Sequence, residues 1–144
     1  MRSDFEVFLE SDVYLKHLYG EKNSVLLKCL ELFNCYTSVI NASEVFSFFK
    51  TKKQEETAKQ AFFGSGVLGV PYKYSHTIGK LLKEKIEIRD AVVCAIALET
   101  KLPIVSFTEE KAEMFKRTGI KFLHPHIIQK YKNPQLIFKK ANLI

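Results

Sequence analysis

The chain has 144 residues, of which 47% are apolar and 26% are charged, and its formal net charge at pH 7 is +6. This length and apolar content suit one domain, over residues 1–144, that buries a core without disulfide staples. No uncharged run is long enough to span a bilayer and the N-terminus lacks the apolar stretch of a signal peptide, so we expect a cytoplasmic protein with no membrane association.

The positive charge is unevenly distributed along the chain. Residues 111–144 contain eight Lys or Arg residues and one acid, Glu113, whereas the preceding part is close to neutral. A basic C-terminal third favours binding to phosphate backbones or to an acidic partner. A solvated lysine-rich face is the alternative interpretation.

The three cysteines, Cys29, Cys35 and Cys94, are an odd number without metal-type spacing. We expect reduced thiols that pack as small apolar side chains, which agrees with a cytoplasmic location.

Short apolar runs alternate with helical spacing of apolar residues along the chain. The first part predicts, in order, a strand at residues 5–9, helices at 13–19 and 26–33, and a strand at 35–40. Ser11 or Asp12 is the expected cap of the first helix, and Ser24 precedes the second. Asn41 is the expected cap of the next helix, with Glu44 three residues beyond it.

The second part predicts helices at residues 42–49 and 53–63, a loop or short extended piece at 64–71, helices at 75–85 and 90–99, a strand at 104–106, a helix at 108–118 and a strand at 120–123. The basic tail, residues 124–144, can add a final helix around Ile127, Ile128 and Tyr131. The order predicts an α/β fold with a central, mainly parallel sheet flanked by helices and a core over about residues 5–123.

Acidic residues stand where successive strands meet helices. Glu10 follows the first strand, Glu44 lies in the first turn after the second, and Asp90 begins the helix before the third. Glu109 follows that third strand. Because sites in parallel sheets form at the carboxyl ends of the strands, we expect these side chains to converge. Converging carboxylates are commonly neutralised by a hard cation such as Mg²⁺ or Mn²⁺. Taken singly, each acid could instead be a helix cap or a solvated strand end.

Three segments carry a family resemblance. Residues 8–15 (FLESDVYL) resemble the opening motif of PIN domains, an apolar strand followed by an acid, a small hydroxyl residue and a second polar residue. Residues 37–45 (TSVINASEV) are similar to the second motif, in which a glutamate begins a helix. Residues 90–98 (DAVVCAIAL), with the strand at 102–106 (LPIVS), resemble the third. The likeness covers about residues 5–123.

This resemblance implies a magnesium- or manganese-dependent ribonuclease of the toxin–antitoxin type. Glu10, Glu44 and Asp90 would hold the metal ion and act in the hydrolysis of RNA phosphodiester bonds. Glu109 would assist, with Glu110 as the second choice. The resemblance also implies an antitoxin protein as partner and a homodimer.

The many phenylalanines of the helices predicted at 42–49 and 53–63 divide, we expect, between the core and a groove for a partner helix or a dimer face.

The sequence departs from the family pattern at two motifs. The first acid is normally Asp, whereas this chain has Glu10, and Asp12 is an alternative if the register is shifted. Thr108 stands where the fourth motif has a polar or acidic residue. The alternative function is therefore a catalytically impaired PIN-like module that binds RNA or a protein partner without cleavage. A phosphate-receiving signalling domain is disfavoured, because Asp4 precedes a strand and Asp90 begins a helix.

Overall fold

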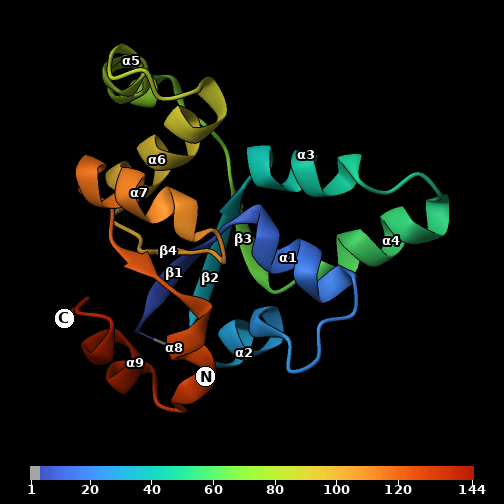
Figure 1. Ribbon diagram of the computed structural model, residues 1–144. Coiled ribbons are helices and arrows are strands. Elements are labelled where there is room, and N and C mark those ends of the chain that lie inside the picture. Colours follow the sequence, from blue (N-terminus) through green and yellow to red (C-terminus); the bar gives the residue numbers. More distant parts are fainter. Residues whose placement is uncertain (1–3) are drawn as a thin grey trace.

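A five-stranded sheet forms the centre of the molecule in a computed structural model, which describes residues 4–144 (Figure 1). The expected absence of a signal peptide rests partly on residues 1–3, which lie outside the described residues. The strands are β1 (Glu6–Leu9), β2 (Asn34–Ser38), β3 (Ser65–Leu68), β4 (Ile104–Val105) and β5 (Phe122–Leu123). Their order is β3-β2-β1-β4-β5, and each pairing is parallel. The predicted α/β class is confirmed.

Helices connect the strands and cover both faces of the sheet. They are α1 (Ser11–Leu18), α2 (Val25–Leu32), α3 (Val39–Ser47), α4 (Lys52–Ala61), α5 (Ser75–Lys83), α6 (Ile88–Thr100), α7 (Ala112–Thr118), α8 (Pro125–Lys130) and α9 (Pro134–Lys140), with 3-10 turns η1 (Tyr72–Tyr74) and η2 (Glu109–Lys111). The sequence predicted four strands, and the expected loop or short extended piece contains the fifth, β3. Glycine is needed at position 66 of this edge strand, because a Cβ there would lie only 2.8 Å from the Tyr36 ring and would clash with it.

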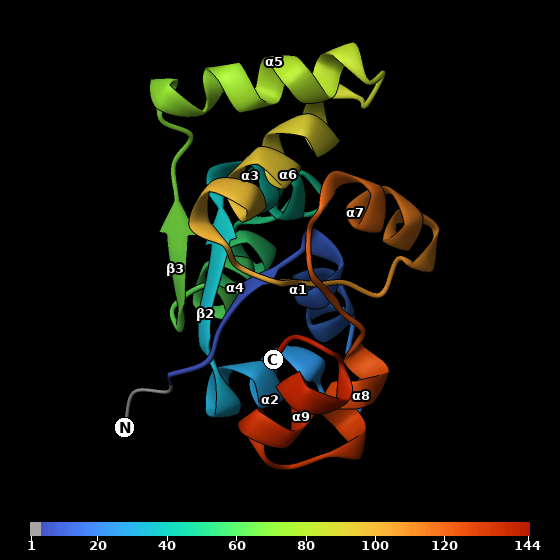
Figure 2. The same ribbon diagram turned by 90° about the vertical axis from the view of Figure 1, so that its left-hand side faces the viewer.

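Side chains alternate across the sheet and build a core on each face. Val7 and Leu9 of β1 belong to the cluster that includes α1, α2, α4, α8 and α9. Phe8 points to the opposite face and packs with α5, α6 and α7. The small residues of α6, such as Ala91 and Ala95, are completely buried and let this helix lie tightly on the sheet. In both Figure 1 and Figure 2, α5 lies at the opposite end of the molecule from α8 and α9.

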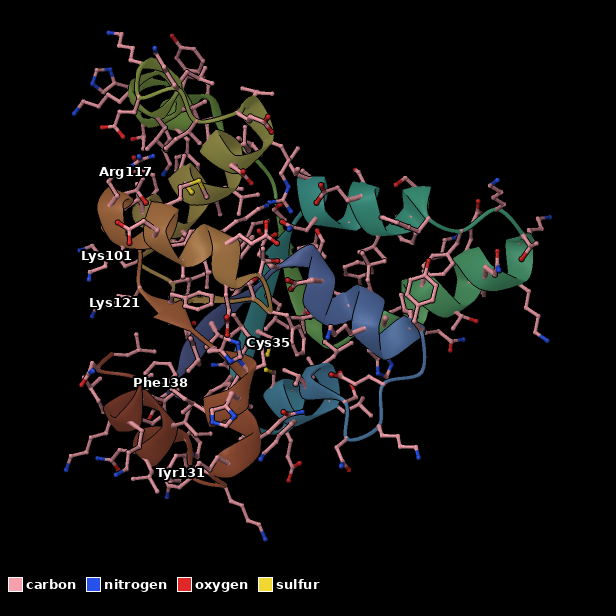
Figure 3. The ribbon with its side chains drawn as sticks, viewed as in Figure 1. Cys35, Lys101, Arg117, Lys121, Tyr131 and Phe138 are labelled. Atoms are coloured by element: carbon pink, nitrogen blue, oxygen red, sulfur yellow. The ribbon has the colours of Figure 1, made fainter. Side chains whose placement is uncertain are left out.

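The residues expected as a basic tail contribute to the core. Ile128 of α8 and Ile137 of α9 are completely buried, and they join the same cluster as β1. Phe138, labelled in Figure 3, packs edge-on against Phe5 with ring centroids 4.9 Å apart. The predicted final helix is present as α8, and a second helix, α9, follows it.

Cysteine burial agrees with the expected reduced thiols. All three cysteines are free and buried, and burial raises the pKa of Cys35 and of Cys94 to about 12. Within residues 4–144, no helix combines the length and apolar character needed to cross a membrane.

The phenylalanines around α3 and α4 divide between core and surface. Phe62 is buried and lies beside Phe46, with ring centroids 5.6 Å apart. Phe48 and Phe63 are exposed. Figure 1 shows α3 and α4 projecting beyond the sheet as an arm. Phe48 is the C-cap of α3, and Phe63 follows the C-cap of α4.

Candidate active site

An open cleft lies at the carboxyl ends of β1, β2 and β4. The chain reverses its direction of strand addition between β1 and β4, and such reversal points are where parallel sheets form crevices. The cleft has a volume of about 550 Å³, and its lining includes Glu10, Glu44 and Asp90. The structure therefore brings three of the four predicted site residues together.

Glu10 is the N-cap of α1, in place of the expected Ser11 or Asp12. Its extended backbone ends β1, and its own carboxylate accepts a hydrogen bond from the Ser11 amide at 3.2 Å. The residue is only 3% exposed, so its carboxylate oxygens need hydrogen-bond partners within the protein. Ser11 is the first helical residue and also lines the cleft.

The second strand ends earlier than predicted, and this changes the roles of Asn41 and Glu44. Val39 and Ile40 are already helical, and Ser38 caps α3 by accepting from the Asn41 amide. The prediction that Asn41 is the N-cap is therefore wrong. Its completely buried side chain donates to Glu10 Oε1 at 2.6 Å and to Ser11 Oγ at 3.0 Å.

Glu44 follows Asn41 by almost one helical turn and faces the same cleft. Ser11 Oγ donates to Glu44 Oε1 at 2.6 Å. A role for Glu44 only as the capping-box partner of Asn41 is thus excluded, because the cap lies at Ser38. The hydroxyl of Ser11 connects α1 to α3 and fixes the direction of the Glu44 carboxylate.

Asp90 lies in the first turn of α6 but does not cap it. The N-cap is Glu87, and Asp90 is three residues beyond, where a negative charge is stabilised by the helix dipole. Lys111 of η2 donates to Asp90 Oδ1 at 3.0 Å. This ion pair connects the start of α6 to the segment that follows β4.

Arg89 occupies the middle of the acidic cluster. Its Nη2 donates to Glu10 Oε1 and to Glu44 Oε1, both at 2.7 Å. Its Nη1 donates to Glu10 Oε2 at 2.8 Å and to Asp90 Oδ1 at 3.0 Å, and its Nε donates to Glu44 Oε2 at 3.0 Å. One guanidinium group thereby binds all three carboxylates, and the side chain is 25% exposed toward the cleft.

These contacts determine the ionisation of the site. Burial raises the pKa of Glu44, but hydrogen bonds from Arg89 and Ser11 outweigh it, and the net pKa lies below its ordinary value. Burial also raises the pKa of Asp90, and the opposing effect of Lys111, followed by Arg89, lowers it overall. The pKa of Arg89 is raised, because its bonds to Glu10 and Glu44 outweigh the effect of burial. Glu44, Asp90 and Arg89 are therefore all charged at neutral pH.

The segment after β4 is held by Asp12 and supplies no fourth acid to the cleft. Asp12 Oδ2 accepts from Ser106 Oγ, from the Phe107 amide and from Thr108 Oγ1 at 2.8–3.0 Å. Glu109 begins η2, and its side chain is 80% exposed and faces His124 Nε2 at 3.3 Å. Glu109 is not part of the cleft lining. The residues of this segment that line the cleft are Thr108 and Lys111.

The carboxylates have the right chemistry for a divalent cation, and Arg89 lies between them. Three carboxylates already converge on one cationic group, and oxygen ligands of this kind suit Mg²⁺ and Mn²⁺. In this arrangement, no cluster of three His, Cys, Asp or Glu side chains in residues 4–144 is placed to share a metal ion. The oxygen donors suit a metal ion by their chemistry, and in this arrangement they bind Arg89 instead.

The sequence prediction missed Arg89, Lys111 and the inward-facing Asn41. Arg89 did carry a signal, because a cation in the first turn of a helix opposes the helix dipole and requires an acidic partner. Lys111 had no comparable signal in the sequence, since its ion pair with Asp90 depends on where η2 lies relative to the start of α6.

Comparison with known proteins finds similar structures but no similar sequences among family models and curated proteins. No protein-family model and no curated protein matches the chain. The fold is similar to a solved toxin–antitoxin complex from Klebsiella pneumoniae, with a TM-score of 0.63 and 18% identity over 74% of this chain and 90% of that one. It is also similar to VapBC2 from Rickettsia felis, solved with a DNA fragment of its promoter, with a TM-score of 0.67 and 16% identity over 83% and 98%.

A third similar structure is VapC20 from Mycobacterium tuberculosis, a toxin that cleaves the sarcin–ricin loop. Its TM-score is 0.56, with 13% identity over 79% of this chain and 95% of that chain. At such identities the likeness establishes the fold.

Proposed function

We propose that this chain, which has the PIN-domain fold of the VapC toxins, is a divalent-metal-dependent ribonuclease of the toxin type. The observation that carries the proposal is the convergence of Glu10, Glu44 and Asp90 in one open cleft at the carboxyl ends of the strands. A similar fold occurs in VapC20, which cleaves the sarcin–ricin loop. The substrate class proposed for this chain is RNA, and the bond hydrolysed is a phosphodiester.

Glu10, Glu44 and Asp90 are the proposed ligands for Mg²⁺ or Mn²⁺. Such an ion, when bound, would activate a water molecule and stabilise the charge that develops on the phosphate. Asn41 positions Glu10 and Ser11 positions Glu44 through the hydrogen bonds described above. These bonds reduce the conformational freedom that the carboxylates would otherwise lose on binding an ion.

Lys111 is placed to contact an RNA phosphate, because its ammonium group lies beside Asp90 in the lining of the cleft. Glu109, with Glu110 as the second choice, stays the proposed assisting carboxylate. That role requires η2 to turn, since Glu109 here faces His124.

The proposed partners follow from the same family. VapBC2 and the Klebsiella pneumoniae protein were solved as toxin–antitoxin complexes. For this chain we propose an antitoxin protein that covers the exposed rings of Phe48 and Phe63, at the C-terminal ends of α3 and α4, and a homodimer as the assembled state. The cytoplasm is the proposed compartment.

The test is cleavage of a mixed set of labelled RNAs by the purified protein, with Mg²⁺, with Mn²⁺ and with a chelator. The test variant combines Glu44→Gln with Asp90→Asn, and Glu56→Gln on the exposed face of α4 is the matched control. We expect metal-dependent cleavage by the wild type and the control, and none by the double variant. Cleavage that persists in the double variant would remove the acidic cluster from the mechanism.

A catalytically impaired module is the second candidate function. Two observations favour it: Arg89 neutralises the carboxylates, and Thr108 stands in place of a fourth acid. RNA binding that weakens steeply with salt, without cleavage at any metal concentration, is the result expected for this module.

A further inference from the structure

Arg89 binds the same oxygen atoms that the proposed metal would need. It contacts both carboxylate oxygens of Glu10, both of Glu44 and one of Asp90. A guanidinium group has five N–H donors, and these five bonds direct them all at the acids. We infer that Arg89 is an internal counter-ion that competes with a divalent cation for the three carboxylates, so that metal binding requires the Arg89 side chain to leave. This inference rests on the proposed function.

The charges of the cleft support direct competition. With Arg89 and Lys111 in place, the three carboxylates are largely neutralised, and a divalent ion entering the cluster would meet the guanidinium group at short range. Like charges at such distances repel strongly in a partly buried site. Once Arg89 has left, Glu10, Glu44, Asp90 and Lys111 carry two net formal negative charges, and Asp12 and Glu87, which also line the cleft, add to the negative charge that a divalent ion would meet.

Arg89 is also able to leave without unfolding the site. Its side chain is partly exposed and borders an open cleft. Its hydrogen bonds go to the three acids and, at 3.4 Å, to Ser11, all of which belong to the cleft itself. The first turn of α6 disfavours a cation, so the acids are what hold the guanidinium inward. If a competing cation binds those acids, the interactions that hold the Arg89 guanidinium in the cleft are lost.

A purely structural ion pair is the competing explanation, and it makes different predictions. If Arg89 only stabilises the fold, its removal lowers stability and leaves the affinity for metal unchanged. If Arg89 competes with metal, its removal lowers stability in metal-free buffer and raises metal affinity, because three repelling carboxylates are left for the ion to neutralise.

The experiment measures Mn²⁺ binding by titration calorimetry and thermal unfolding with and without Mn²⁺. The variants are Arg89→Gln, Arg89→Lys, the Glu44→Gln and Asp90→Asn double variant, and Arg117→Gln as the matched control. Arg117, labelled in Figure 3, is exposed on α7 and is not among the residues that line the cleft. Arg89→Lys keeps the positive charge but loses the multiple hydrogen bonds of the guanidinium group. It is the variant to compare with the wild type if Arg89→Gln does not fold without metal.

We expect Arg89→Gln to bind Mn²⁺ at least about tenfold more tightly than the wild type, a difference of about 1.4 kcal/mol, while Arg117→Gln matches the wild type. Arg89→Lys should bind with intermediate affinity. Without metal, Arg89→Gln should melt below the wild type, and Mn²⁺ should raise its melting temperature by more than it raises that of the wild type.

Equal Mn²⁺ affinity in the wild type, Arg89→Gln and Arg89→Lys would overturn the inference. The proposed function would survive that result if the double variant lost both Mn²⁺ binding and cleavage. Absence of Mn²⁺ binding in every variant would overturn the inference and the metal-dependent function together.

Discussion

The buried Asn41 side chain joins two of the elements that carry the carboxylates, and Asn41→Ala should measurably destabilise the protein. The change removes a bond to the buried Glu10 carboxylate and bonds with the Ser11 and Ser38 hydroxyls. A hydrogen bond to a charged group contributes about 1.5–3 kcal/mol and a neutral one about 1 kcal/mol. Because Glu10 keeps its two bonds from Arg89, we expect the free energy of unfolding to fall by about 2–4 kcal/mol.

Urea denaturation followed by circular dichroism measures this loss. Ser43→Ala is the matched control, because Ser43 is exposed on the same helix and its hydroxyl donates to the Val39 carbonyl, and its effect should stay within about 0.5 kcal/mol. In a double-mutant cycle with Glu10→Gln, the two changes together should cost less than the sum of the single changes. A loss below about 1 kcal/mol for Asn41→Ala, or strict additivity in the cycle, would refute the reasoning.

Three further predictions follow from burial and charge. Glu44 and Asp90 have lowered pKa values in the fold, so they stabilise it above the ordinary carboxyl pKa of about 4 and lose this effect as the pH falls through the folded values. The urea midpoint should therefore drop on acidification from about pH 5 to pH 3, and by less when Glu44→Gln and Asp90→Asn are combined. Phe115→Ala should cost about 3–5 kcal/mol in urea denaturation, because this ring is 1% exposed and stacks on β5, whereas Phe63→Ala on the surface should be nearly neutral. The buried thiols should react with a disulfide reagent only on unfolding, and rapid labelling of the native protein would contradict their burial.

Most of the fold could be predicted because its elements have strong local signals. The alanine-rich helix that contains Asp90 and the apolar strand after it stand out by periodicity alone. The edge strand β3 is hard to recognise in the sequence, because Gly66 and the flanking Gly64 and Gly69 resemble a loop and its strand identity comes from pairing with β2. Likewise, Val39 and Ile40 favour a strand by composition, but the Ser38 cap places them in α3.

The acidic residues of the candidate site could be predicted from the sequence, whereas its cationic residues could not. Glu10, Glu44 and Asp90 could be expected together, since the carboxyl ends of parallel strands meet at one edge. Arg89 and Lys111 enter the same cleft through side-chain geometry that strand order does not specify. The expected fourth acid illustrates the same limit, because one exposed turn decides whether Glu109 faces the cleft or His124.

The first strand of the chain is also the central strand of the sheet, and this has a consequence for folding kinetics. Phe8 of β1 pairs with Tyr36 of β2 on one side and with Ile104 of β4 on the other. The second pairing closes a very long loop, so the transition state must organise distant parts of the chain, and folding is expected to be slower than in a helical bundle of equal size. Until β4 arrives, one side of β1 is an unpaired apolar edge, and that edge is where newly made chains would associate with each other.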